Sequence, residues 1–390
     1  MKRYLHLLTI TALLFLCSAQ QGIGQEFVEK IADFFEFDFG RNRHSEDTTL
    51  FVNKVVLAPV MTYEPNTNLG IGVGAKILFK PRGAGPETRT SNIPLSLQYT
   101  LNNQFLFYSG YTIFFNEEKY LLKGNLEFSK FPFSYYGVGN TSDESTVIDI
   151  SFDNFLIEPL LLRRVAPDLF IGGGFRYNTI YNTRLIEDTA ELPEGTSLQD
   201  ELGSTSAGVE LAITYDSRDN VLYPLNGNFL EFTHGVYGKV AGGIHEFMLS
   251  KLDLRQYFQI NPDRLDMLAL QWFVRYAWND APPLELSDLG GPVLLRGFQE
   301  GRFRDRLALF AQAEYRWQAL DRIGFVFFAG AGDVSREIGT FSLDNLKYSL
   351  GSGIRVKIVK SENLNIRFDY GFGFGPTNAN NFYLGISEAF

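Results

Sequence analysis

Residues 363–374 read NLNIRFDYGFGF and alternate between apolar side chains and polar or small ones. One face carries Leu364, Ile366, Phe368, Tyr370, Phe372 and Phe374, and the other carries Asn363, Asn365, Arg367, Asp369, Gly371 and Gly373. A period of two residues is that of a β-strand, so one face suits lipid and the other suits water. A soluble β-sandwich would alternate in the same way, but its strands are usually shorter, ~5–6 residues.

The alternation recurs in successive segments from residue 51 to the C-terminus. It predicts sixteen strands, over 51–61, 68–79, 92–101, 104–114, 119–129, 151–163, 169–179, 205–215, 228–238, 244–258, 266–277, 305–317, 322–332, 347–358, 363–374 and 382–390. An even number is typical of a single-chain bacterial outer-membrane barrel. The longest gaps all follow odd-numbered strands, as expected when both termini lie in the periplasm. The sequence therefore predicts an all-β fold, a sixteen-stranded antiparallel transmembrane β-barrel over 51–390 in the bacterial outer membrane.

Composition excludes several other classes of protein. Apolar residues make up 45% of the 390 residues and aromatic residues 15%, which is too apolar for a disordered chain. Beyond the N-terminus, no segment is apolar for the ~18 residues that a membrane-spanning helix needs. The net charge of −10 does not suit a nucleic-acid-binding protein, which needs a basic face. We expect outer-membrane lipid, and not nucleic acid, as a partner.

The N-terminal residues 1–24 are typical of an export signal, with two cations followed by an apolar run. The only cysteine, Cys17, lies in this signal, so the mature chain is expected to have no disulfide and no thiolate metal site. Residues 25–50 form a short leader, with apolar residues of 27–35 at helical spacing. This leader is either a short helix that plugs the lumen or a frayed segment without function.

Candidate catalytic and metal-binding groups are sparse. A Ser/His/acid hydrolase needs a histidine that reaches a serine, and the mature chain offers His44 in the leader, His234 on the predicted lipid face and His245 at a strand start. The acidic cluster at 216–220 lacks the glycine and the glutamate of a calcium loop, so an Asx-type turn is the better interpretation. We therefore expect no enzyme activity, no cofactor and no metal.

The long connection 278–304 contains the segment LGGPVLLRGFQEGRFRDR, which spans 289–306 with the next strand. Apolar residues and arginines are mixed in it, which is unfavourable for a loop exposed to water. Folded back into the lumen, the arginines could pair with inward-facing carboxylates. The sequence thus predicts an inward-folded loop.

This segment resembles the sixth-loop signature of the BamA/TamA-type bacterial surface antigen superfamily, the outer-membrane barrels of barrel assembly and polypeptide translocation. The resemblance extends to APVMTYEPNTNLGIGVGA (58–75), YYGVGN (135–140), TYDSRDNVLYPLNGNFLEF (214–232) and YSLGSGIRVKIVKSENLNIRFDYGFG (348–373). It implies a sixteen-stranded barrel with the loop inside. It also implies that Arg296, Gly297 and Phe298 form the loop tip and that Glu314 is the acid paired with Arg296.

Two departures from the family pattern affect what the resemblance implies. The family's aromatic-x-Asp-x-Gly motif on the thirteenth strand is degenerate here, with Phe328, Gly330 and Gly332 in the stretch FAGAG (328–332) and Asp333 one residue out of phase. Family members usually carry periplasmic domains that receive the client protein, and we expect none in this chain.

The resemblance implies a function in inserting or translocating unfolded outer-membrane or secreted polypeptides. The expected site is the seam between the first and last strands, marked by Pro59, Gly385 and Phe390. Proline lacks a ladder donor, so this seam could open sideways. The alternative is a passive pore or a structural barrel without insertase activity. Arg296 either braces the barrel or takes part in opening it.

Overall fold

The computed structural model describes residues 36–41, 52–64, 68–82, 84–85, 87–100, 105–140, 147–186, 197–261, 263–359 and 363–390. The predicted signal 1–24, with Cys17, lies outside the described residues. So does most of the predicted leader 25–50, with His44. The part of this leader that is described, Glu36–Arg41, is a strand, β1.

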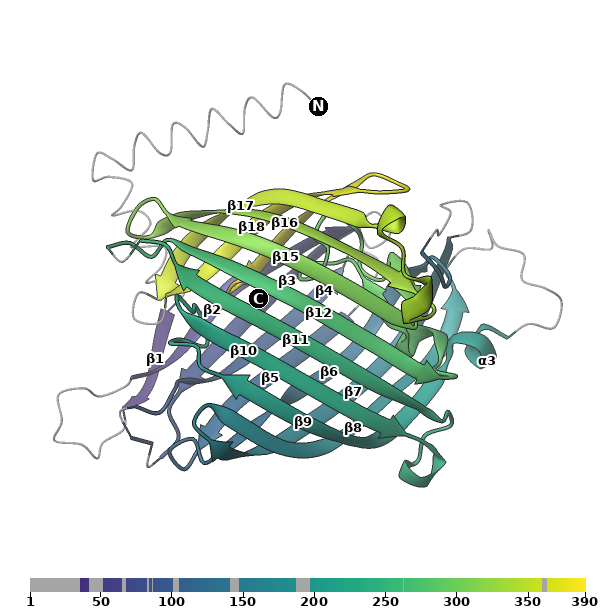
Figure 1. Ribbon diagram of the computed structural model, residues 1–390, viewed down its shortest axis with the longest axis horizontal. Coiled ribbons are helices and arrows are strands. Elements are labelled where there is room, and N and C mark those ends of the chain that lie inside the picture. The colour runs from purple at the N-terminus through teal and green to yellow at the C-terminus, as the bar shows by residue number, and fades with distance from the viewer. Residues whose placement is uncertain are drawn as a thin grey trace, which may run out of the picture.

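The described chain is an antiparallel sheet closed into a barrel, which confirms the predicted fold class (Figure 1). The sixteen barrel strands are β2 (Val52–Glu64), β3 (Asn68–Phe79), β4 (Ser91–Thr100), β5 (Phe105–Phe115), β6 (Tyr120–Tyr135), β7 (Ile148–Ala166), β8 (Leu169–Leu185), β9 (Ser204–Asp216), β10 (Gly227–Tyr237), β11 (Phe247–Gln259), β12 (Met267–Asn279), β15 (Leu307–Gln318), β16 (Ile323–Ser335), β17 (Lys347–Val359), β18 (Leu364–Phe374) and β19 (Ala379–Ile386). Each pairs with the next along the chain, and β19 closes the barrel on β2. Strands β6, β7 and β8 extend several residues beyond their predicted ends.

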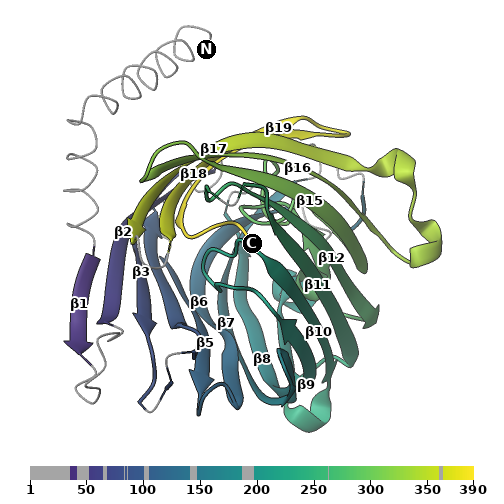
Figure 2. The same cartoon turned by 60° about the vertical axis from the view of Figure 1, so that its left-hand side comes forward.

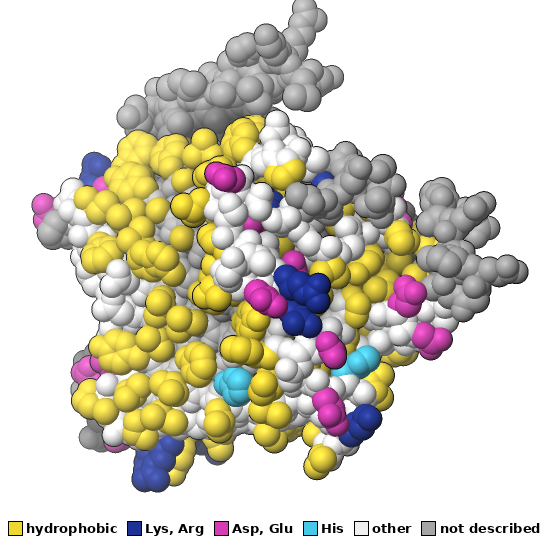
Figure 3. All heavy atoms as spheres, turned by 45° about the vertical axis from the view of Figure 1, so that its right-hand side comes forward, with side chains coloured by type: hydrophobic (Ala, Val, Ile, Leu, Met, Phe, Trp, Pro, Cys, Tyr) yellow, Lys and Arg dark blue, Asp and Glu magenta, His cyan; other side chains and the backbone are white. Residues whose placement is uncertain are grey.

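Side chains alternate between the outer wall and the lumen. On β9, Val209 and Leu211 are 64% and 70% exposed, whereas Ala212 is 1% exposed. On β18, Phe372 points outward and Asp369 is completely buried. Apolar side chains cover much of the outer wall (Figure 3), as a lipid-facing surface requires. Among the described residues, no helix is long and apolar enough to cross a membrane.

Most of the longer connections lie at one end of the barrel and most of the short turns at the other. The longer ones carry α3 (Leu198–Leu202) before β9, η2 (Lys239–Ala241) before β11, η3 (Pro283–Glu285), β13 (Ser287–Leu289) and β14 (Phe303–Asp305) before β15, and η4 (Ile338–Thr340) and η5 (Leu343–Asn345) before β17. The exceptions at the other end are the connection 80–90 and the turn 217–226. Asn220 Oδ1 accepts bonds from the amides of Leu222 and Tyr223 there, as in an Asx-type turn.

The strand β1 lies beside β2 on the side away from β3 (Figure 2), so it is a seventeenth strand of the main sheet. Its register places Glu36 opposite Val56 and Arg41 opposite Val52. The helical spacing in 27–35 gave no indication of this strand, because the alternation that marks it is only six residues long.

Candidate functional site at the loop tip and the seam

The connection between β12 and β15 folds into the lumen. Its two ends pair as β13 and β14, and the residues between them form a loop tip, defined here as Leu295–Phe298. Apolar side chains of the loop pack with those of β15 and β16 in one buried cluster: Leu289, Leu295, Phe298, Phe303, Ala308, Phe310 and Val334. Burial of this apolar surface holds the loop inside the barrel.

Arg296 at the loop tip is fully buried between two carboxylates. Its Nη2 lies 2.6 Å from Glu314 Oε2 on β15, and its Nη1 lies 2.9 Å from Asp369 Oδ2 on β18. Its Cζ is 3.6 Å from the centroid of the Phe328 ring on β16, a cation–π contact. The structure thus brings together Arg296, Glu314 and Phe328, all named from the sequence, and adds Asp369.

These pairs belong to a closed ring of alternating charges. Arg316 Nε lies 2.7 Å from Glu314 and 3.7 Å from Glu388, Arg355 Nε lies 2.6 Å from Glu388, and Arg355 Nη1 lies 2.5 Å from Asp369. Since Asp369 and Glu314 both bind Arg296, three arginines and three acids close the circle. The ring connects the loop tip, three strands and the C-terminal tail. Opposite charges at these distances offset the cost of burying each ion.

Gly297 and two glycines of β18 allow the loop tip to approach the wall. Gly297 has φ +114, and a Cβ there would lie 2.5 Å from backbone atoms of Phe372 and Gly373. A Cβ on Gly371 would lie 2.8 Å from Gly297 N, and one on Gly373 would lie 2.6 Å from the Phe298 ring. No other residue type fits these positions without displacing the loop tip.

The loop tip is hydrogen-bonded to β19, the last strand of the barrel. The hydroxyl of Tyr383 accepts from Gly297 N at 3.0 Å and donates to Phe298 O at 3.1 Å. Asn381 Nδ2 donates to Gly297 O at 3.1 Å. Sequence reasoning did not identify Asn381 and Tyr383, because nothing in the alternation tells which inward side chain the loop will reach.

The degenerate thirteenth-strand motif contacts the loop tip through Phe328, whose ring lies against the Arg296 guanidinium. Gly330 and Gly332 lie on β16 against Phe310, where a Cβ would be 3.0 and 2.9 Å from its ring. Asp333 is buried, and its carboxylate bonds to Lys347 and not to the loop tip. The second acid that Arg296 contacts comes instead from Asp369. The sequence pattern placed Asp369 on the inward face of its strand, but it did not indicate that Arg296 would be its partner.

The seam between β2 and β19 is narrow. Among the described residues, the two strands are in register at one position, Tyr383 opposite Thr62. Continuing this antiparallel register three residues further would place Pro59 opposite Ile386, where β19 ends. Gly385 lies just before that end. If the register continues, the predicted Pro59 and Gly385 lie close to each other near the end of β19.

Phe390 differs from its predicted place at the seam. The predicted last strand, 382–390, ends at Ile386, and Ser387 has a positive φ of 76° that turns the chain inward. The Phe390 ring packs in the lumen, and its carbonyl accepts from Arg316 Nη2 at 2.9 Å. The C-terminal residues lie in the lumen because Arg355 and Asn365 bind the carboxylate of Glu388 there.

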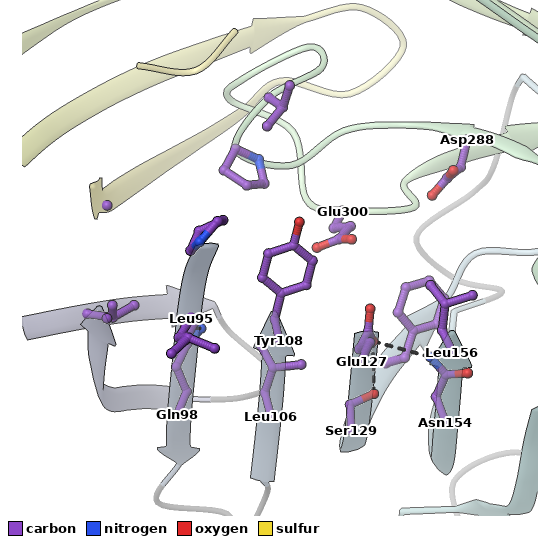
Figure 4. Close-up of a pocket in the computed structure, with 18 of the residues that line it drawn as sticks. Leu95, Gln98, Leu106, Tyr108, Glu127, Ser129, Asn154, Leu156, Asp288 and Glu300 are labelled. Atoms are coloured by element: carbon purple, nitrogen blue, oxygen red, sulfur yellow. Dashed lines mark hydrogen bonds between the residues drawn. The ribbon is translucent and has the colours of Figure 1, made fainter. Parts of the chain in front are cut away.

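A cavity of about 730 Å³ lies in the lumen beside the loop (Figure 4). Tyr108, Glu127 and Asn154 line it from β5, β6 and β7, and Asp288 and Glu300 line it from the loop. Its wall also includes Val60 of β2 and Gly385 of β19, so it reaches the seam. The cavity, which is lined by both polar and apolar side chains, is continuous with the place where the barrel closes.

Groups suited to other chemistry lie apart from this site. His234 is on the outer wall, with Nδ1 2.9 Å from Ser250 Oγ. His245 lies at the rim, among the residues that line a separate pocket. In the part of the chain that the structure describes, no group of three His, Cys, Asp or Glu side chains could hold a metal ion. The arrangement at the loop tip can brace strands against one another, and it couples this bracing to the seam.

Comparison with known proteins identifies the family. Residues 169–390 match the Omp85 superfamily domain, which is more than half of the chain. The fold is similar to that of BamA from Haemophilus ducreyi lacking POTRA domains 1-3, with a TM-score of 0.54 and 12% identity over 94% of this chain and 78% of that one. It is also similar to CdiB from Acinetobacter baumannii, with a TM-score of 0.58 and 13% identity over 87% of this chain and 61% of that one. No curated protein matches the sequence.

Proposed function

The chain belongs to the Omp85 superfamily, and from this premise we propose that it inserts or translocates unfolded polypeptides at the seam between β2 and β19. It is an outer-membrane β-barrel similar in fold to BamA and CdiB. Its partners in this proposal are outer-membrane lipid and an extended polypeptide client. The proposed action is non-enzymatic and uses no cofactor, because it requires strands to separate and no bond to be cleaved.

The observation that carries the proposal is the contrast between the seam and the other strand pairs. β2 and β3 are in register along Lys54–Glu64, whereas β2 and β19 meet only at Thr62 and Tyr383. Each backbone group that lacks a partner in lipid is costly, so a short ladder is the place where a barrel opens with least loss. An incoming strand could pair with the edges exposed there.

The loop tip supports this proposal because it contacts the same residue that closes the seam. Tyr383 pairs with Thr62 through its backbone, while its hydroxyl bonds to Gly297 and Phe298. The charged ring fixes the loop tip to β15 and β18. In this proposal, the ring and the loop tip hold β19 in place and set how readily the seam opens.

A reversible disulfide across the seam tests the proposal. Met61→Cys and Leu384→Cys, introduced into a Cys17→Ser background, are opposite each other if the register of Thr62 and Tyr383 continues. The oxidised barrel should remain folded but lose insertion of an unfolded outer-membrane protein into liposomes, and a reductant should restore it. The matched control places cysteines at Leu350 and Phe372, which are partners in the continuous β17–β18 ladder.

The passive pore is the second candidate, and the cavity of about 730 Å³ favours it. A pore needs only a continuous aqueous path and no movement at the seam. It predicts ion conductance in planar bilayers that the seam disulfide leaves unchanged, together with no insertion by the reduced protein. The insertion proposal fails if this combination is observed.

A further inference from the structure

The edge of β2 that faces away from β3 has two different partners along its length. Near its C-terminal end, Thr62 is opposite Tyr383 of β19. Near its N-terminal end, Val52, Lys54, Val55 and Val56 are opposite residues of β1. Figure 2 shows β1 alongside β2 at the place where β2 has no other neighbour on that side. If the register of β19 with β2 continues, β19 ends opposite Pro59. β1 begins opposite Val56, three residues further along β2.

The C-terminal strand cannot cover this edge itself. After Ile386 the chain turns into the lumen, and the buried charges hold it there through Glu388. Without β1, the backbone of Val52–Val56 would have N–H and C=O groups without a strand partner. Such an edge is unfavourable in lipid and is a template for pairing with another strand.

The sequence of β1, EFDFGR, suits this edge but covers little of it. Apolar and acidic residues alternate in the sequence of Glu36–Phe39, as is typical of a membrane-spanning strand. The register of β1 places Asp38 opposite Lys54, which are opposite charges. The register becomes irregular between Asp38 and Arg41, and the strand has six residues where β2 has thirteen. A strand this short is bound weakly compared with its neighbours.

We propose that β1 is a resident, displaceable occupant of the Val52–Val56 edge of β2 and controls the access of other extended strands to this edge. The inference rests on the proposed function, because the strand that replaces β1 is then the incoming polypeptide. β1 seals the edge in the resting protein and competes with the client for it. Removing β1 therefore makes the edge available to a strand supplied from outside.

A peptide competition experiment tests this without relying on insertion activity. The probe is a synthetic peptide with the sequence EFDFGR and a photoreactive group, and a scrambled peptide is its control. It should crosslink to residues 52–56 of a variant that lacks 36–41, and at least about tenfold less to the unaltered protein. Asp38→Lys, which places two lysines opposite each other, should give intermediate labelling if the deletion variant does not fold.

The outcomes separate this inference from the proposed function. Equal labelling of the unaltered and deleted proteins, or labelling by the scrambled peptide, would overturn the proposed role of β1. If the deletion variant captures the peptide but neither protein inserts a client, this role of β1 stands and the proposed function fails. If both stand, the deletion should also speed client insertion, and a disulfide between Phe37→Cys and Val55→Cys should slow it until it is reduced.

Discussion

Arg296 lies at the junction of the charged ring, so its removal affects two buried acids at once. In Arg296→Ala, Glu314 and Asp369 each lose a guanidinium partner at 2.6 and 2.9 Å. Breaking one side of a buried ion pair costs about 3–5 kcal/mol, and we expect a loss of that order in the free energy of unfolding. A urea titration in detergent measures this free energy, with the folded fraction at each urea concentration read from heat-modifiable migration on gels.

Arg306→Ala is the control, because Arg306 pairs with the exposed Asp280 at the rim, where ion pairs contribute little. Adding Glu314→Gln to Arg296→Ala should recover part of the loss, since the ring then has two arginines and two acids instead of two arginines and three acids. An unchanged unfolding transition in Arg296→Ala would contradict the structural role of the ring. Bracing predicts that insertion persists in the variant, and gating predicts that insertion is lost while the barrel stays folded.

The sequence predicted some of these contacts and not others for a physical reason. Arg296 and Glu314 were named together from the family motif, and the alternation in 363–374 already placed Asp369 in the lumen. The alternation does not show how far the loop tip extends across the lumen. The sequence therefore indicated no partner for Asp369. Glu388 was assigned to the last strand, and its position depends on arginines of β15 and β17 that no local pattern connects to it.

At the scale of single elements, β19 is positioned by the Tyr383 hydroxyl. Tyr383→Phe removes both hydrogen bonds to the loop tip but keeps the aromatic ring and the backbone pairing with Thr62. A lost buried hydrogen bond costs about 1 kcal/mol, more where an amide is left unpaired. We expect a lower unfolding temperature and more frequent seam opening, seen as slower disulfide formation between Met61→Cys and Leu384→Cys.

The control for this element is Tyr370→Phe on the neighbouring β18. Its hydroxyl bonds to Asn380 Oδ1 at 3.0 Å on the outer wall, away from the loop tip. This variant should leave the rate of seam disulfide formation unchanged. Equal effects of the two variants would show that the loop tip does not act through Tyr383.

The small residues of β18 predict a second element-scale effect. Gly373→Val would place a side chain where the Phe298 ring now lies, with the Cβ already 2.6 Å from the ring. The loop tip should be displaced from the wall, so protease cleavage within 290–304 should increase. Gly339→Val is the matched control, because a Cβ there has no atom within 4 Å. Resistance to cleavage in Gly373→Val would mean that the loop does not depend on this close approach.

The base of the loop should respond to acid through Glu285. Burial by itself raises the pKa of this carboxyl, but Arg176 and the hydrogen bonds from Arg176 and Asn178 outweigh burial and hold the pKa below its usual value of 4.5. A lowered pKa means stability that is present above pH 4.5 and lost as the pH falls through the folded value. The stability difference between the unaltered protein and Glu285→Gln should therefore shrink on acidification, as melting curves at several pH values would show.

The strand elements were predictable to within a few residues because alternation persists along each one. The extensions of β6, β7 and β8 were not predicted, although β6 still alternates over its last residues, FPFSY. The seventeenth strand, β1, was missed because six residues carry too little periodicity. Its identification depends on the edge of β2 that β19 leaves uncovered, which is a property of the closed sheet.

For the whole molecule, the lumen is filled from both ends. The β12–β15 loop enters from one end, and at the other the turn 217–226 buries Leu222 against β2, β3, β17 and β18. Tyr223 packs beside Phe390 of the C-terminal tail. Opening a path for a polypeptide along the axis would require both fillings to move, whereas opening at the seam requires a short ladder to part. The architecture therefore favours sideways exit.

The expected orientation of the barrel, with both termini in the periplasm, can be tested on intact cells. The connection that carries η4 and η5 follows β16, the thirteenth barrel strand, and the turn 260–266 follows β11, the tenth, so they should lie on opposite sides of the membrane. Ile338 is 78% exposed and Asp263 is also exposed. In a Cys17→Ser background, Ile338→Cys should react with a membrane-impermeant maleimide on intact cells, whereas Asp263→Cys should react only after the outer membrane is permeabilised. Leu350→Cys, on the lipid-facing wall, should stay unlabelled in both cases, and labelling of Asp263→Cys from outside would reverse the proposed orientation.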